Sequence, residues 1–231
     1  MKPALPRADD RTYSVPTLRG ALQLLPPPPA DEAAQQDLEA VHAAQQSRTP
    51  EQIVEAEASS AMDAFVFDSV LGPAFTRERV PGTAEFIKRV FRSSLPHLQA
   101  TKNCWNRPRP FMVDPTIAPL ERSLASTRLR FAPAPAEDMS YAPSYPSGHA
   151  FVGAMLAILL SELVPERRVE LSAFGRAYGD ARVTSGVHFP SDVEAGRMLA
   201  ALLVEALQQD ARFRADLRKA RQELRRALGY R

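Results

Sequence analysis

The stretch that most constrains the fold is residues 150–164, a nearly unbroken apolar run that ends at Pro165. The run is shorter than the roughly 20 residues that a helix needs to cross a bilayer, and Glu162 lies inside it. We therefore expect a fully buried central helix over about residues 148–164, with the other helices packed around it.

Helix start and stop signals divide the rest of the chain into further helices. Thr49-Pro50-Glu51-Gln52 has the pattern of a capping box with proline at the first helical position, and apolar residues at helical spacing continue to Leu71. Asp31 is expected to cap an earlier helix that runs to about Gln46. The other expected helices are one that starts near Thr83 and those at residues 121–128, 166–181, 190–208 and 210–228.

No stretch alternates apolar and polar residues as a half-buried strand would, so the predicted fold class is all-α, a single-domain helical bundle. Residues 1–30 are expected to form an extended, Pro-rich N-terminal segment, and residues 31–231 one domain. Prolines recur between Phe111 and Tyr145, which predicts a long loop that could serve as a lid or a pocket wall.

Composition excludes several classes of protein. The formal net charge of +2 is too small to indicate a nucleic-acid partner. Cys104 is the single cysteine, so no intrachain disulfide can form. The first residues contain no apolar segment of a signal peptide; either the protein stays in the cytoplasm, or a leader was removed before this sequence begins.

Three clusters within residues 102–192 carry groups suited to chemistry. They are Lys102 with Arg109-Pro110, then Pro146-Ser147-Gly148-His149, and then Arg182 with His188 and Asp192. The permanent cations among them would repel a metal ion but suit a compact, multiply charged anion, of which tetrahedral phosphate is the commonest. The collection favours phosphoryl transfer through a histidine nucleophile, with no cofactor.

The third cluster has the spacing of an oriented nucleophile. Pro190 places Asp192 in the first turn of a helix, from which its carboxylate can reach back to a ring nitrogen of His188. Such a contact fixes the tautomer of the imidazole and leaves the other nitrogen free to attack. Arg182 can return to the same pocket across Gly186.

The other two clusters supply donors. Ser147 is a natural N-cap of the buried helix, and the first N–H groups of that helix, beside Gly148, form an anion seat. His149 lies at the mouth of this seat, where it suits a general acid. Lys102 and Arg109 are expected to reach the site from a loop stiffened by proline, Arg109 binding phosphate through two N–H groups.

In this order and spacing the three clusters resemble the signature of the type 2 phosphatidic acid phosphatase (PAP2) superfamily, which includes the vanadium haloperoxidases. Within it, the chain is most similar to the bacterial class A non-specific acid phosphatases. That similarity rests on the short length, the Pro-rich segment before the first helix, and Ser144-Tyr145 before the Pro-Ser-Gly-His turn. The resemblance covers about residues 24–208 and implies a PAP2-like fold and metal-independent hydrolysis of phosphomonoesters.

The resemblance also implies a role for each motif residue. His188 would become a phosphohistidine, Asp192 would orient it, and His149 would protonate the leaving alcohol and then activate water. The groups that would hold the phosphoryl oxygens are Lys102, Arg109, Ser147, Gly148 and Arg182. Ala181 stands where the family usually has serine, and a missing donor of this kind can cost about 10²–10³ in rate. Export of the family's members implies a periplasmic location and a leader missing from this version of the chain.

Three alternatives stay open. A vanadate-dependent haloperoxidase could use the same cage of cationic side chains to bind vanadate, although those chains are generally much longer. A membrane lipid phosphatase is disfavoured because no segment spans a bilayer. A phosphate-binding module without chemistry would need neither His149, His188 nor Asp192, yet Ala181 keeps it open. The expected partner is a small-molecule phosphomonoester, without nucleic acid or membrane insertion, and a homo-oligomer is an open possibility.

Overall fold

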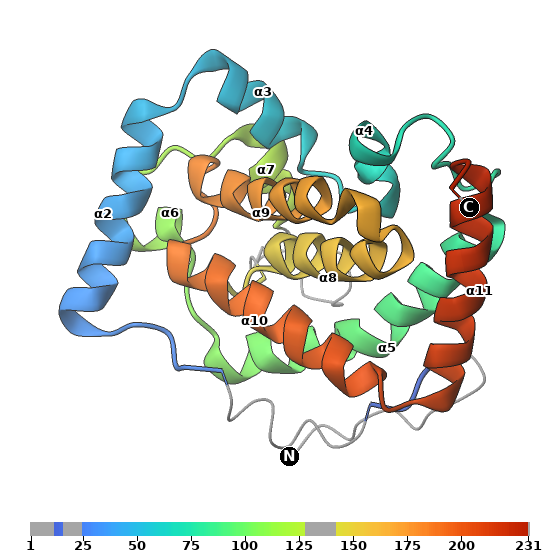
Figure 1. Ribbon diagram of the computed structural model, residues 1–231. Helices are drawn as coiled ribbons and strands as arrows, with labels where there is room; N and C mark the ends of the chain where they lie inside the picture. The colour runs from blue at the N-terminus through green and yellow to red at the C-terminus, as the bar shows by residue number, and fades with distance from the viewer. Residues whose placement is uncertain (1–11, 16–24, 128–141, 231) are drawn as a thin grey trace.

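Helix α8 (Gly148–Leu163) lies at the centre of the computed structural model, which describes residues 12–15, 25–127 and 142–230 (Figure 1). Most of its side chains are buried, including those on opposite sides of the helix. This confirms the predicted central helix. In the described ranges every regular element is a helix, so the all-α class is confirmed as well.

Two helices contact α8 almost backbone to backbone. Helix α9 (Arg168–Thr184) crosses it where Gly153 faces Gly175; a Cβ atom at Gly175 would lie 2.7 Å from the carbonyl oxygen of Gly153. Helix α10 (Pro190–Leu207) approaches at Gly196, where a Cβ atom would lie 2.5 Å from the carbonyl oxygen of Ser147. Because only glycine fits such contacts, the start of α10 is held against the start of α8.

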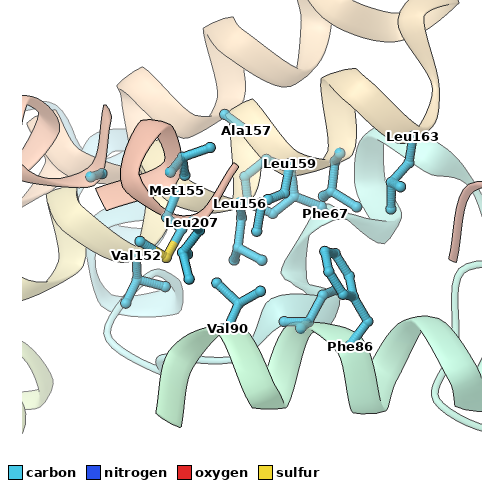
Figure 2. Close-up of a cluster of buried hydrophobic side chains, with 14 of the residues drawn as sticks. Phe67, Phe86, Val90, Val152, Met155, Leu156, Ala157, Leu159, Leu163 and Leu207 are labelled. Carbon is cyan, nitrogen blue, oxygen red and sulfur yellow. The ribbon is translucent and has the colours of Figure 1, made fainter. Parts of the chain in front are cut away.

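The apolar core fills the space between α8 and the helices α5 (Pro81–Trp105) and α11 (Ala211–Ala227). Phe86 and Val90 of α5 point into the same cluster of buried side chains as Leu156 of α8 and Leu207 of α10 (Figure 2). Helix α11 packs against α5 and α8 and buries Phe213. Burial at about 25 cal/mol per Å² of apolar area makes this cluster a main source of stability.

Helices α2 (Asp31–Ser47) and α3 (Pro50–Ala58) pack against α9 (Figure 1). The capping box that opens α3 is present as predicted: Thr49 Oγ1 accepts from the N–H of Gln52 at 3.3 Å, and Gln52 Oε1 accepts from the N–H of Thr49 at 2.9 Å. The short elements are η1 (Ala64–Phe67), α4 (Asp68–Leu71), α6 (Pro110–Val113), α7 (Glu121–Ser126) and η2 (Pro165–Arg167). In the described part of the chain, no helix is both long enough and apolar enough to cross a membrane.

The prediction of one helix from Thr49 to Leu71 was wrong, because α3 ends at Ala58. Ser59 Oγ donates to the carbonyl of Ala56 at 2.9 Å, and Ser60 Oγ donates to that of Glu57 at 2.6 Å. Serine hydroxyls that bond nearby backbone groups compete with the helical ladder. The chain turns here before η1 begins.

Two smaller predictions were also wrong. Asp31 does not cap α2: Ala30 is the N-cap, without a side-chain hydrogen bond, and Asp31 is the first helical residue, with φ 51°. Lys102 does not lie in a loop but in the last turn of α5. Within the loop predicted as a lid between Phe111 and Tyr145, residues 128–141 lie outside the described residues.

Candidate active site

The His188 ring is held between Asp192 and Arg109. Its Nδ1 lies 3.2 Å from Asp192 Oδ2 and its Nε2 lies 3.2 Å from Arg109 Nη1. A carboxylate can only accept, so Nδ1 carries the proton and Nε2 presents its lone pair toward the guanidinium. Burial, followed by the charge of Arg109, lowers the pKa of His188 well below its ordinary value. The ring is therefore a neutral imidazole in one fixed tautomer, as the spacing of residues 188 and 192 predicted.

The Asp192 carboxylate is fully buried and bonded at both oxygens. Oδ2 also accepts from Ser144 Oγ at 2.5 Å and from the N–H of Phe189 at 2.9 Å, while Oδ1 accepts from Arg107 Nη1 at 2.7 Å. Burial alone would raise the pKa of Asp192, but the contact with His188, the charge of Arg107 and the bond from Ser144 lower it to about 2. The carboxylate is thus ionised throughout the working range of an enzyme.

Lys102 and Arg109 lie buried beside this pair, each on backbone carbonyls. Lys102 Nζ donates to the carbonyl of Pro143 at 2.5 Å, and Arg109 donates to the carbonyls of Ala142 and Val187, both at 2.8 Å. Burial is the main cause that lowers the pKa of Lys102 well below its usual value and that of Arg109 to about 10. Carbonyl oxygens carry no full charge, so the positive charges of both side chains are available to an anion.

Arg182, in the last turn of α9, is fully buried. Its Nη2 donates to the carbonyl of Ala56 at 2.5 Å and to Ser59 Oγ at 2.7 Å. Its Nε and Nη1 are buried and have no hydrogen-bond partner among the described residues. Buried donors are nearly always satisfied, so these two groups are available to an acceptor such as a phosphate oxygen.

His149 and Ser147 occupy the start of α8. Ser147 Oγ accepts from the N–H of Ala150 at 3.4 Å, which confirms Ser147 as the N-cap, and the N–H of Ser147 donates to the carbonyl of Asp192 at 2.8 Å. His149 Nε2 donates to the carbonyl of Ser60 at 3.0 Å. Burial, and next the charge of Arg182, lower the pKa of His149 to about 3.

The structure therefore brings all three sequence clusters into one buried site. The glycine turn after α9, with Gly186 at φ 71°, lets the N–H of His188 bond the carbonyl of Arg182 at 3.3 Å. Gly148 begins α8 between Ser147 and His149. Ser144 and Arg107 contact Asp192 but were not predicted from the residues. The signal available for Arg107 was its place within the first cluster, two residues before Arg109.

Comparisons with known proteins agree with this geometry. The family model described as the PAP2 superfamily matches residues 84–214. The chain is 33% identical over 209 residues to a non-specific acid phosphatase of Salmonella typhimurium, a match that covers 87% of this chain and 78% of the relative. It is 36% identical over 149 residues to an acid phosphatase of Zymomonas mobilis; this match covers 64% of this chain but only 52% of that relative.

The fold has a solved counterpart. It is similar to the crystal structure of a transmembrane PAP2 type phosphatidylglycerolphosphate phosphatase from Bacillus subtilis, with a TM-score of 0.51 and 21% identity. The match covers 78% of this chain and 86% of that one, and at this identity it speaks for the fold alone. Both the Salmonella and the Zymomonas relative are acid phosphatases, and the family match covers more than half of this chain. The chain belongs to the PAP2 superfamily.

Proposed function

We propose that this chain is a metal-independent acid phosphatase that works through a phosphohistidine on His188. The observation that carries the proposal is the neutral His188 ring, with Nδ1 on Asp192 and Nε2 turned to Arg109. A ring held this way has one nucleophilic atom and one fixed direction of attack. The N–H groups of Arg182 that have no partner among the described residues would supply donors for the phosphoryl group.

In the first step, Nε2 of His188 bonds to phosphorus and the bond from phosphorus to the ester oxygen breaks. Lys102, Arg109 and Arg182 stabilise the charge on the phosphoryl oxygens, together with the hydroxyl of Ser147 and the N–H of Gly148 at the start of α8. In the phosphorylated imidazolium that forms, Nδ1 keeps its proton and donates it in a hydrogen bond to Asp192. These roles need no metal ion, because the protein's own cations supply the positive charge.

His149 would protonate the leaving oxygen in the first step. Its Nε2–H group now donates to the carbonyl of Ser60, and the leaving oxygen would replace that acceptor. A bound phosphate dianion raises the pKa of a neighbouring imidazole, which offsets the lowering by burial and Arg182. In the second step a water molecule gives a proton to His149 and attacks phosphorus, the N–P bond breaks, and phosphate leaves.

Labelling identifies the nucleophile. After a quench in alkaline detergent, labelled substrate should leave phosphate on His188, in a form labile to acid and comparatively stable to alkali, unlike phosphoserine on Ser147. His188→Ala should abolish labelling and turnover while inorganic phosphate still binds to the cationic cage. Label on another residue would refute the assignment, and turnover without any label would refute the covalent route.

A pair of substrates tests His149. In His149→Ala, hydrolysis of a nitrophenyl phosphate should partly persist, because the nitrophenolate leaving group needs little protonation. An alkyl ester should lose about 10²–10⁴ in rate, the scale of a lost general acid. Equal losses for both esters would mean that His149 has another role.

We also propose, from the family resemblance, a periplasmic location, which fractionation of cells expressing the full gene would test.

A further inference from the structure

We propose that Arg107 is a positioning residue for phosphoryl transfer: it holds the Asp192 carboxylate in the orientation that binds Nδ1 of His188. The inference rests on the proposed role of His188 as the nucleophile. None of the roles assigned to the three sequence clusters includes Arg107, and in this proposal Arg107 does not touch the phosphoryl group.

Arg107 is fixed on several sides. Its Nη1 donates to Asp192 Oδ1 and to Ser191 Oγ, both at 2.7 Å, and its Nη2 donates to Asp37 Oδ2 at 2.8 Å. The guanidinium carbon lies 3.9 Å from the centre of the Phe189 ring, a cation–π contact. The side chain is only 9% exposed. Arg107 therefore joins α2, which carries Asp37, to the first turn of α10.

Asp37, the second carboxylate that Arg107 contacts, is also held by hydrogen bonds from α10. Asp37 accepts from the N–H of Ser191 at 3.1 Å and from Ser191 Oγ. Both carboxylates and the serine hydroxyl thus converge on one guanidinium, whose planar fork can serve two acceptors at once. A lysine at this position could reach one carboxylate but not replace the whole set.

The two oxygens of Asp192 have separate tasks. Oδ2 takes the bonds from His188, Ser144 and the N–H of Phe189, whereas Arg107 is the partner of Oδ1 among the described residues. Without Arg107, one oxygen of a fully buried carboxylate would lose its charge-assisted bond, a strongly unfavourable state. The carboxylate would then turn toward another donor, and His188 would lose the acceptor that fixes its ring.

The charge pattern separates Arg107 from the phosphate ligands. Lys102, Arg109 and Arg182 donate to uncharged carbonyl or hydroxyl oxygens, so their charges are free to attract an anion. Arg107 instead pairs with the two carboxylates of Asp37 and Asp192. Its loss should therefore slow the reaction without weakening phosphate binding.

The test compares Arg107→Met with Arg197→Met. Arg197 lies further along α10 and pairs with Asp180 and Glu194, neither of which is a proposed site residue. In Arg107→Met, kcat for an aryl phosphate should fall about 10²-fold, the scale of a misplacement near 1 Å, while the inhibition constant of inorganic phosphate changes less than about threefold. Arg197→Met should keep the kcat of the parent protein.

The pH profile supplies a readout that a merely structural role would not move. The groups that face the Asp192 and His188 pair are Arg107, Arg109, Lys102 and Ser144. Removing the cation at Oδ1 raises the pKa of Asp192, so the acid limb of the profile should shift to higher pH in Arg107→Met. Arg107→Lys should return part of kcat and bring the acid limb back toward that of the parent protein.

Three results would overturn the proposal: an unchanged kcat in Arg107→Met, an equal loss in Arg197→Met, or a parallel loss of phosphate binding. If Arg107→Met does not fold, Arg107→Gln removes the charge but keeps a polar side chain, and an unshifted acid limb with full kcat would overturn the proposal there. Label on a residue other than His188 in the parent protein would instead refute the proposed nucleophile.

Discussion

The contact between α8 and α10 at Gly196 offers a direct test of how the site is assembled. A Cβ atom at this position would lie 2.5 Å from the carbonyl oxygen of Ser147 and 3.1 Å from both the Cβ of Ala150 and the N of Phe151. None of these atoms can rotate away. An ordinary contact begins near 3.4 Å, so Gly196→Ala must separate the helices here by about 0.9 Å, which is 3.4 minus 2.5.

This separation acts on the two halves of the site. Ser147 and His149 move with α8, while Asp192 moves with α10 and His188 lies just before it. We expect kcat/KM for an aryl phosphate to fall about 10²-fold, because a 1 Å misplacement of reacting groups costs about that much. The free energy of unfolding should fall by no more than about 2 kcal/mol, because overpacking costs about 1–3 kcal/mol and the helix propensity of alanine over glycine returns about 1 kcal/mol. Steady-state kinetics and urea unfolding measure both quantities.

Gly175→Ala is the matched control. A Cβ atom there would lie 2.7 Å from the carbonyl oxygen of Gly153 and from the Cβ of Ala157, a similarly close contact between α8 and α9 but without a site residue at the point of collision. It should reduce stability by a similar amount and kcat/KM by only a few-fold. If Gly196→Ala kept kcat/KM within about threefold, or if Gly175→Ala lost as much activity, the contact at Gly196 would not be what aligns the two halves of the site.

Three further outcomes are expected. Hydrolysis of an aryl phosphate should survive dialysis against EDTA, and activity that is lost and then restored by Zn²⁺ or Mg²⁺ would rule out a cage of protein cations alone. Because the pKa values of His149 and His188 are both lowered, His188 stays neutral well into the acid range while His149 loses its proton as pH rises; kcat/KM should therefore peak on the acid side of neutrality, and a steady rise through pH 9 would contradict these roles. The folded-state pKa of His149, about 3, lies below the ordinary value of about 6.5, so the unfolded chain binds the extra proton; the free energy of unfolding should fall as pH drops from about 6.5 toward 3, less steeply in His149→Gln than in the parent protein.

Much of the helical framework was predictable because its signals are local. The apolar run at residues 150–164 and the capping box at Thr49 each specify a structure through neighbours in sequence, and α8 and the start of α3 appear where these signals place them. The contact between His188 and Asp192 also depends on one helical turn, so spacing alone indicated it.

Arg107 and Ser144 could not be found in this way. They bond Asp192 from positions 85 and 48 residues away in the chain, and no periodicity links residues at such separations. Arg107 also meets Asp37, 70 residues away, on the first of the predicted helices. The supporting contacts of a buried carboxylate depend on how distant helices pack, which a single sequence does not specify.

The early end of α3 has a cause of the same kind. In a continuous helix the carbonyl of Ala56 would accept from the N–H of Ser60, but Ser60 bonds the carbonyl of Glu57 instead, at 3.1 Å. The carbonyl of Ala56 is thereby released, and it accepts from Arg182, whose side chain is buried and needs acceptors. The carbonyl of Ser60, freed by the same turn, accepts from His149. The apolar periodicity of the sequence continues across this segment and so predicts a longer helix. In the structure the carbonyl oxygens of Ala56 and Ser60 instead accept hydrogen bonds from Arg182 and His149, both more than 80 positions away in the chain.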